Sequence, residues 1–204
     1  MYTDLTISQQ EADKLTAISE LGGEKASEAL SIMTNQELSV EISGTDIAKL
    51  EEISKSIGEN DLVTAVFLKI QGDLNGGIIL LFPEKSGLNM VDLLLKNQSG
   101  TTQKLDSMGI SALKETGNIL VGNYLTAMSN NLHLNVIGSV PDLATDMKDS
   151  IMNSIAVELS KNNARETMIF KMQFQVTDNS TSGQMLMFFD AASAEKMKSV
   201  ISKI

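Results

Sequence analysis

The amino-acid sequence predicts an α+β fold in which two similar halves share one β-sheet and each half places a long helix at the surface. Three observations predict it: a helix-like segment recurs in the second half, a hairpin-like segment recurs in the same order, and 42% of the 204 residues are hydrophobic. A chain of this size and composition can bury a substantial core. We expect one domain over residues 1–204, with repeats at about 10–100 and about 105–204 related by a pseudo-twofold axis.

The first repeat relates two helix-like segments. LTAISELGGEKASEALSIMTN (15–35) aligns with ISALKETGNILVGNYLTAMSN (110–130) at an offset of 95 residues, with six identical pairs. In the second segment, apolar residues recur at the period of one buried helix face: Ile110, Leu113, Leu120, Tyr124 and Met128. Two Gly-Asn pairs, at 117–118 and 122–123, interrupt this helix, although each glycine costs a helix interior about 1 kcal/mol relative to alanine.

The second repeat predicts two hairpins. LVTAVFLKI (62–70) precedes GGIILLFPEKSG (76–87), and ETMIFKMQFQV (166–176) precedes the similar SGQMLMFFDAAS (182–193). The turns between these runs, QGDLNGG and TDNSTSG, are polar and contain glycine, as hairpin turns do. Similar patterns can arise without duplication, but two matches in the same order favour it. Each half is therefore expected to run helix, strand, helix or loop, hairpin and closing helix.

The composition excludes several kinds of site. The chain has no cysteine and a single histidine, His133, so it lacks the residues for a thiolate nucleophile, a disulfide framework or a zinc site, and no metal site is expected. Its formal net charge of −10 would repel phosphate backbones and anionic lipids, so nucleic acid and membrane surfaces are poor partners. Neither a signal segment nor an apolar run of about 18 residues occurs, and we expect a cytoplasmic location.

Four residues of the interrupted helix form a polar row. At about 100° per residue, Ser111, Glu115, Asn118 and Gly122 fall within about 60° of one another, away from the apolar stripe. Gly117 lies toward the apolar side, where a missing side chain would permit close packing, whereas Gly122 would leave space for a docking partner. An ordinary solvated face would show the same spacing, but asparagine is a mediocre helix former that usually occurs at caps. Its position in mid-helix therefore needs a reason, and these residues alone leave a solvated face and a functional surface both open.

These residues resemble a family signature. Ser111-x3-Glu115-x2-Asn118, followed 23 residues later by Pro141, is similar to the S/D-x3-E-x2-N-x22-P signature of the CheC, CheX and FliY phosphatases of bacterial and archaeal chemotaxis. The surrounding ETGNILVGN resembles the signature helix of that group, and the chain length and internal duplication are similar to those of CheC. The resemblance covers nearly the whole chain and implies a CheC-like fold.

The resemblance implies a substrate and a role for each residue. The substrate would be a phosphorylated CheY-type receiver, which holds its aspartyl phosphate with its own Mg²⁺ and a lysine, so no cofactor of this chain is implied. Asn118 would orient the attacking water, and Glu115 would hold the receiver in register. Ser111 and Gly122 would frame the site, and Pro141 would shape the segment beside it.

The first half departs from the signature. At the offset of 95, Thr16, Glu20 and Gly23 stand at the signature positions, so the carboxamide is missing. Without it nothing would place the water, and we expect the first half to be catalytically silent. Glu20 would then be either a solvated glutamate or a contact to a partner.

The resemblance also implies a second partner, the receptor deamidase CheD, bound through a helix that follows Pro141. Asp146, Met147 and Ile151 would contribute to that surface. The apolar stripe that begins at Met147 and Ile151 is equally typical of a helix that packs on the sheet, and the sequence leaves both open.

Three functions follow from these residues. The leading hypothesis is a phosphatase of a CheY-type receiver, because Glu115 and Asn118 are both present. The alternative is a non-catalytic adaptor that binds CheD or a receiver domain. A flagellar-switch component, related by fold to FliM and FliY, is the third, although such proteins would need additional segments for motor assembly.

Overall fold

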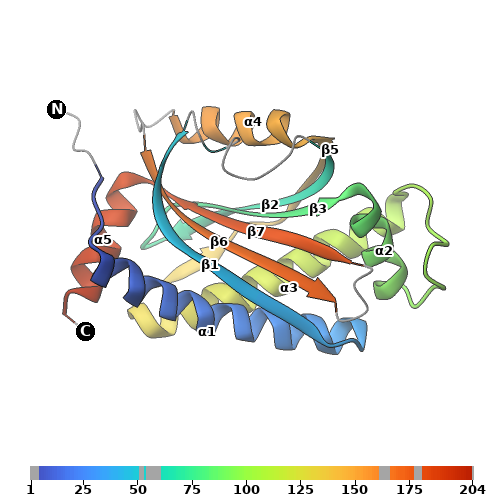
Figure 1. The fold of residues 1–204 in the computed structure, drawn as a ribbon, viewed down its shortest axis with the longest axis horizontal. Helices are drawn as coiled ribbons and strands as arrows, with labels where there is room; N and C mark the ends of the chain where they lie inside the picture. Colours follow the sequence, from blue (N-terminus) through green and yellow to red (C-terminus); the bar gives the residue numbers. More distant parts are fainter. Residues whose placement is uncertain (1–4, 51–52, 54–60, 161–165, 177–180, 204) are drawn as a thin grey trace.

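The computed structural model describes residues 5–50, 53, 61–160, 166–176 and 181–203. Within these ranges the chain forms five helices and one seven-stranded antiparallel sheet (Figure 1). The elements of the first half are α1 (Gln9–Thr34), β1 (Leu38–Lys49), β2 (Leu62–Gly72), β3 (Gly76–Pro83) and α2 (Glu84–Leu94). Those of the second half are α3 (Ser107–Leu132), β4 (Val136–Gly138), β5 (Asp142–Met147), α4 (Lys148–Ser160), β6 (Glu166–Val176), β7 (Ser182–Phe189) and α5 (Ala191–Ile201).

The two halves exchange their outer strands. The sheet order is β1-β6-β7-β3-β2-β4, and β5 also pairs with β2. The predicted hairpins are β2–β3 and β6–β7, which meet at the centre of the sheet. The first-half strand β1 pairs with β6 of the second half, while β4 and β5 of the second half pair with β2 of the first. The shared sheet predicted from the sequence is therefore present. In each half, the outer strand of the hairpin pairs with a strand that comes from the other half.

A pseudo-twofold axis passes between β3 and β7. Ile79 pairs with Leu186, and Leu80 pairs with Met185. Residues 76–87 resemble residues 182–193 at an offset of 106, and this offset converts the first of these pairs into the second. The hairpin repeat found in the sequence is thus also the symmetry of the strand register.

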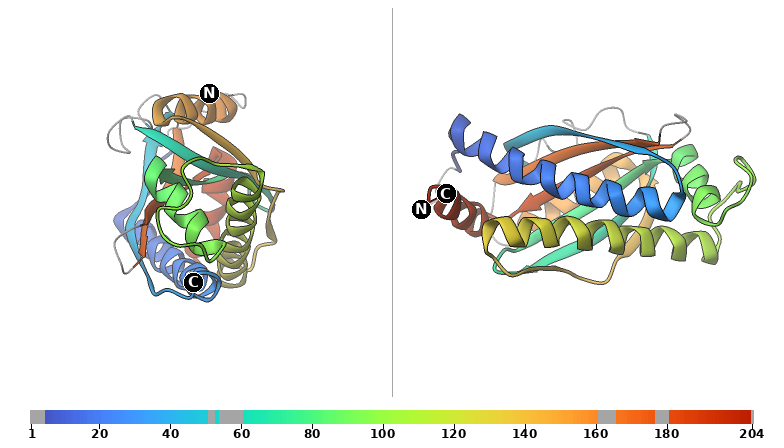
Figure 2. Two further views of the ribbon diagram at one scale, coloured as in Figure 1. Left: turned by 90° about the vertical axis from the view of Figure 1, so that its right-hand side faces the viewer. Right: turned by 90° about the horizontal axis from the view of Figure 1, so that it is seen from below.

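The elements form three layers, with the sheet in the middle. Helices α1 and α3 lie side by side and run in opposite directions across one face (Figure 2), where they cover the larger core. Helix α4 lies on the opposite face over a smaller core that contains Ile151, Met152 and Phe188. Figure 1 shows α2 and α5, which follow the central strands, at opposite ends of the molecule. None of the helices formed by the described residues is both long and apolar enough to cross a membrane.

Local residues fix the ends of the two long helices. Ser8 caps α1 by accepting a hydrogen bond from the backbone N–H of Glu11, and Asp106 caps α3 by accepting one from Gly109. Both helices end before a residue in the left-handed conformation, Asn35 and His133, each with φ of 53°. The two helices are each 26 residues long, so their ends correspond at an offset of 98 residues.

The offset of 98 corrects the sequence alignment at 95. Every buried residue of α1 falls on a buried residue of α3 when 98 is added to its number. At 95, buried Leu15 and Gly23 would instead correspond to Ile110, which is 36% exposed, and to exposed Asn118. A shift of three residues rotates a helix by about 300°, a net displacement of about 60°, so the buried stripes of the two helices overlap only in part at that offset. The identical residues at 95 therefore do not occupy equivalent positions in the fold.

Candidate functional site

The four residues of the polar row lie on the solvent-facing side of α3. Ser111, Glu115, Asn118 and Gly122 are all exposed, while the residues between them that face the sheet are buried. A row spaced by four, three and four residues stays on one side of a helix because 3.6 residues complete a turn. The solvent-facing row expected from the helical spacing is therefore present, and the chemistry assigned to it stays a prediction.

Asn118 and Asn123, the asparagines of the two Gly-Asn pairs, differ in the hydrogen bonds of their side-chain amides. The Asn123 amide donates a hydrogen bond to the backbone oxygen of Ile119 at 2.8 Å. Within the described part of the chain, the side chains of Glu115 and Asn118 take part in no hydrogen bond or ion pair. A carboxamide can donate two hydrogen bonds and accept two, so the Asn118 amide is available to a water and a partner.

The glycines of the two Gly-Asn pairs have different surroundings. A Cβ atom built on Gly117 would lie 2.6 Å from Cγ1 of Val66 on β2, so any side chain there would force Val66 or the helix to shift. The same atom on Gly122 would have no neighbour within 4 Å. Gly117 therefore brings α3 close to the sheet, as expected, and Gly122 leaves the surface beside Asn118 open.

The rotation of α3 about its own axis is fixed by a buried side chain that the sequence reasoning treated only as core. The hydroxyl of Tyr124 lies 2.6 Å from that of Ser19 on α1, and both side chains are buried. Burial raises the pKa of Tyr124 above its usual range, so the phenol stays neutral and can share its proton with Ser19. A serine at a buried position of the α1 stripe was the signal for this contact.

Pro141 lies where the strand beside α3 is interrupted. Strand β4 ends at Gly138 opposite Ile70, and β5 begins at Asp142 opposite Phe67, so three residues face two residues of β2. Proline has no N–H for the ladder, and a bulge of this kind redirects the side chains around it.

The bulge is anchored to β2 and presents an apolar side chain. The Ser139 hydroxyl accepts a hydrogen bond from the backbone N–H of Lys69 at 2.9 Å, and its backbone N–H donates to the Lys69 oxygen at 2.8 Å. Pro141 is buried, whereas Val140 is 87% exposed. Val140 was not singled out from the sequence, although an apolar residue directly before the signature proline was a usable signal.

The first-half residues assigned at the offset of 95 do not form an equivalent row. Thr16 is half-buried, and its hydroxyl donates to that of Thr45 on β1 at 3.2 Å. Gly23 is buried, and a Cβ atom there would lie 3.2 Å from side chains of Val40 and Ile42. Of the three assigned positions, only Glu20 is exposed.

At the structural offset of 98, the positions equivalent to Ser111, Glu115 and Asn118 are Asp13, Ala17 and Glu20, and all three are exposed. The first half thus lacks both the glutamate and the carboxamide, rather than the carboxamide alone. The expectation of a silent first half stays a prediction, and it now rests on Ala17 and Glu20 instead of Gly23.

The segment after Pro141 is a strand before it becomes a helix, which corrects the expected helical surface. Asp146 and Met147 pair with Val63 and Leu62 at the end of β5, and α4 begins only at Lys148. Both β5 residues are exposed, whereas Ile151 on α4 is 9% exposed and packs in the core under that helix. The three residues therefore share no helix face, because pairing with β2 takes Asp146 and Met147 into the sheet.

Comparisons with known proteins find relatives of the same fold. The model of the CheC-like family matches residues 108–144, which include the whole signature from Ser111 to Pro141. The CheY-P phosphatase CheC of Bacillus subtilis (strain 168) is 28% identical over 198 residues, which cover 94% of this chain and 93% of that protein.

Two solved structures show the same fold. FliY of Thermotoga maritima matches with a TM-score of 0.80 at 17% identity, over 98% of this chain and 99% of that one. The CheX–CheY–BeF3–Mg complex of Borrelia burgdorferi contains a chain that matches with a TM-score of 0.56 at 17% identity, over 84% and 96% of the two chains. The family model matches the signature helix, the Bacillus subtilis relative aligns along almost the whole length, and the solved structures share the fold. The chain is therefore similar to the CheC/CheX/FliY family of chemotaxis proteins in both sequence and fold.

Proposed function

We propose that this protein hydrolyses the aspartyl phosphate of a phosphorylated CheY-type receiver. The observation that carries the proposal is the exposed pair Glu115 and Asn118, whose side chains have no partner among the described residues and stand one turn apart on a helix anchored by Tyr124. The name of the Bacillus subtilis relative and the CheY-containing complex of the CheX relative support the same substrate class.

The reaction asks little covalent chemistry of this chain. Water forms a bond to phosphorus while the bond from phosphorus to the aspartate oxygen breaks, which gives a free carboxylate and inorganic phosphate. The receiver's own Mg²⁺ and lysine would stabilise the charge on the phosphoryl oxygens, so the missing element is a water held in line with the breaking bond.

Asn118 is suited to hold that water. A carboxamide accepts a hydrogen bond from the water and donates one to a phosphoryl oxygen without any change in protonation. Glu115, about one turn away on the same face, would pair with the receiver's lysine and set the register. The open surface at Gly122 would admit the receiver, and Ser111 and the bulge at Pro141 would border it.

The alternative is a non-catalytic adaptor that binds CheD or a receiver domain. The observation that favours it is the structural similarity to FliY over 98% of the chain, because this similarity is one of fold and is independent of any catalytic residue. The exposed β5 residues Asp146 and Met147 would then belong to a protein contact.

The decisive experiment measures the loss of labelled phosphate from a CheY-type receiver of the same organism, with and without this protein, in Mg²⁺. Faster loss that requires Mg²⁺ and catalytic amounts of this protein is expected. Binding of the receiver without faster loss would replace the phosphatase by the adaptor. A tight Mg²⁺ complex of this protein alone would contradict the assignment of the metal to the receiver.

A further inference from the structure

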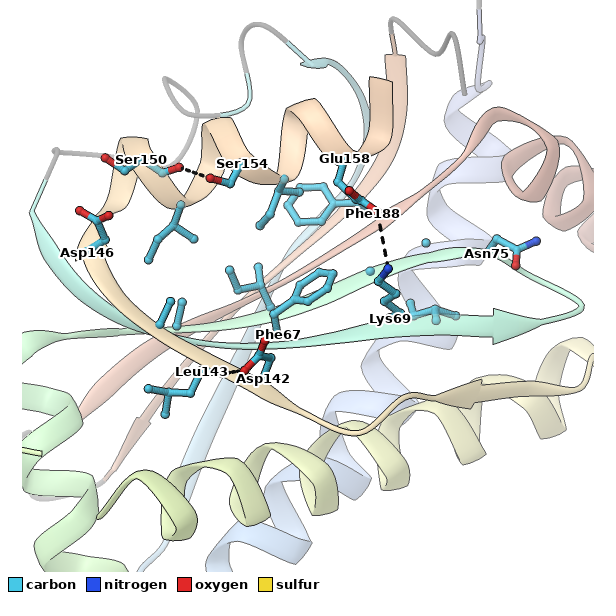
Figure 3. Close-up of a pocket in the computed structure, with 18 of the residues that line it drawn as sticks. Phe67, Lys69, Asn75, Asp142, Leu143, Asp146, Ser150, Ser154, Glu158 and Phe188 are labelled. Atoms are coloured by element: carbon cyan, nitrogen blue, oxygen red, sulfur yellow. Dashed lines mark hydrogen bonds and ion pairs between the residues drawn. The ribbon is translucent and has the colours of Figure 1, made fainter. Parts of the chain in front are cut away.

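A cavity of about 610 Å³ lies on the face of the sheet opposite α1 and α3 (Figure 3). It is bounded by β2 and β3 on one side and by α4 and β5 on the other. Cavities of about 300–1,000 Å³ are the usual size for a small organic ligand. Because the whole sheet separates it from the polar row on α3, the cavity is not part of the site described above.

The deeper wall of the cavity is apolar. Phe67 and Ile79 come from the sheet of the first half, Phe188 from β7, and Ile151 and Ile155 from α4. Phe188 and Ile79 are almost fully buried, whereas Phe67 is half-exposed and presents its ring to the space under α4. Such a wall favours an apolar body that loses contact with water.

The rim of the cavity is acidic. Four carboxylates lie among the described lining residues, those of Asp142, Asp146, Glu158 and Asp190, against the single cation of Lys69. Glu158 forms an ion pair with Lys69 at 3.5 Å. Asp190 accepts the backbone N–H of Ser193 at the start of α5.

The two β5 carboxylates keep capacity for a ligand. Asp142 and Asp146 each accept a hydrogen bond from the backbone N–H of the next residue, at 2.9 and 2.7 Å. One such bond leaves most acceptor positions of a carboxylate free, since its two oxygens accept about four. In Figure 3 Asp142 lies next to Phe67, and Asp146 lies at the end of the cavity near Ser150.

We propose that this cavity binds a small organic cation with an apolar body, such as an aromatic or aliphatic amine. The apolar body packs on Phe67, Phe188 and Ile155, and the cationic group lies at the β5 carboxylates. The excess of carboxylates around the rim repels an anion of the same shape, and the face of Phe67 adds an attraction for a cation. The ligand class therefore follows from the charge of the rim and the apolar wall together.

Direct binding of a probe tests the proposal independently of any phosphatase activity. Aminoacridine, a fluorescent aromatic cation, is titrated against the full chain and followed by fluorescence polarisation. Anthracenecarboxylate has the same three-ring frame with the opposite charge, and tetramethylammonium has the charge without the ring system. We expect saturable binding of one aminoacridine per chain, binding of anthracenecarboxylate weaker by about tenfold or more, and no detectable competition by tetramethylammonium.

Three variants locate the probe. Ser154→Trp fills the cavity from the exposed face of α4 and should abolish binding. The near-isosteric changes Asp142→Asn and Asp146→Asn test the charge without a packing change, and at least one should raise Kd about fivefold. Glu24→Gln, on α1 across the sheet, is the matched control and should leave Kd unchanged. Equal binding of the cationic and anionic probes, full binding to folded Ser154→Trp, or unchanged Kd in both aspartate variants would each overturn the proposal.

Discussion

The hydroxyl of Ser19 on α1 lies 2.6 Å from the hydroxyl of Tyr124 on α3, in the buried contact between the two long helices. The Tyr124 ring fits there because Gly22 has no side chain, since a Cβ atom would lie 2.7 Å from the ring. A buried hydrogen bond at one end of an aromatic side chain leaves little freedom for α3 to rotate. The contact thus determines which face of α3 is presented to solvent.

Removing one partner of this bond should cost stability and little activity. Tyr124→Phe leaves the buried Ser19 hydroxyl with only the sulfur of Met172, at 3.9 Å, as a partner, and we expect the free energy of unfolding to fall by about 1–3 kcal/mol. Ser19→Ala should cost a similar amount, and the double variant should cost less than the sum because the two changes remove one interaction. Urea unfolding of the four proteins measures this coupling. Strictly additive losses would show that the bond has no energetic significance.

Asn118→Ala should reduce receiver dephosphorylation by about a hundredfold or more, because a misplaced reacting group can cost that much in rate. Its stability should not fall, since the residue is exposed and alanine is the better helix former by a few tenths of a kcal/mol. Asn123→Ala is the matched control: the residue type, the helix and the exposure are the same, but its amide bonds the backbone at Ile119. Equal rates for both variants would remove Asn118 from the mechanism.

The two glycines of α3 should respond oppositely to a side chain. Gly117→Ala should destabilise the fold by about 1–3 kcal/mol despite the better helix propensity, because the new methyl group overlaps Val66 on β2. Gly122→Ala should stabilise by up to about 1 kcal/mol. Gly122→Leu should fold normally and weaken receiver binding. Thermal unfolding measures the stability of the three variants, and a binding titration measures the receiver affinity of Gly122→Leu. Unchanged affinity in folded Gly122→Leu would exclude docking over that position.

Glu20→Ala should leave dephosphorylation nearly unchanged. Glu20 occupies the position equivalent to Asn118, but Ala17 stands where the glutamate belongs, so no pair is available to bind a receiver lysine and a water. The initial rate at saturating receiver is the measurement. Loss of most activity in a folded variant would mean that the exposed α1 positions Asp13, Ala17 and Glu20 take part in the reaction.

Asp92 should make stability sensitive to acid. Its burial raises the pKa of the carboxyl, but hydrogen bonds from the hydroxyl and backbone N–H of Thr102 and the backbone N–H of Thr101 outweigh burial and hold the pKa below its ordinary value. A lowered folded-state pKa contributes stability above the unfolded value, about 3.9, and loses it as pH falls through the folded value. The carboxyl ties the connection before α3 to α2, so its protonation loosens that connection.

Urea unfolding between about pH 6 and pH 2 measures this contribution. Wild type should exceed Asp92→Asn in stability at neutral pH, and the difference should shrink as the pH falls. A difference that stays constant across the range would place the stabilising effect in the shape of the side chain rather than in its charge.

The sequence by itself determined the features that depend on local geometry. The row from Ser111 to Gly122 is solvent-facing because helical spacing alone sets it, and the hairpins follow from alternating apolar runs with polar glycine turns. The sequence also marks the starts of α1 and α3, since Ser8 and Asp106 are residue types that cap helix N-termini well. Attention to these caps would have given the offset of 98, because the hydrophobic period alone cannot distinguish alignments one helical turn apart.

Only the tertiary structure decided how distant segments pair. DLATDM (142–147) is mostly exposed and has no strand-like alternation, yet it becomes β5 because the edge of β2 offers unpaired backbone groups that need partners. The exchange of β1 and β5 between the halves has the same cause: strand pairing joins residues far apart in the chain, and no local pattern encodes the partner. The cavity under α4 exists only through that pairing, because β5 bounds one side of it, supplies two of the four carboxylates at its rim and leads directly into α4.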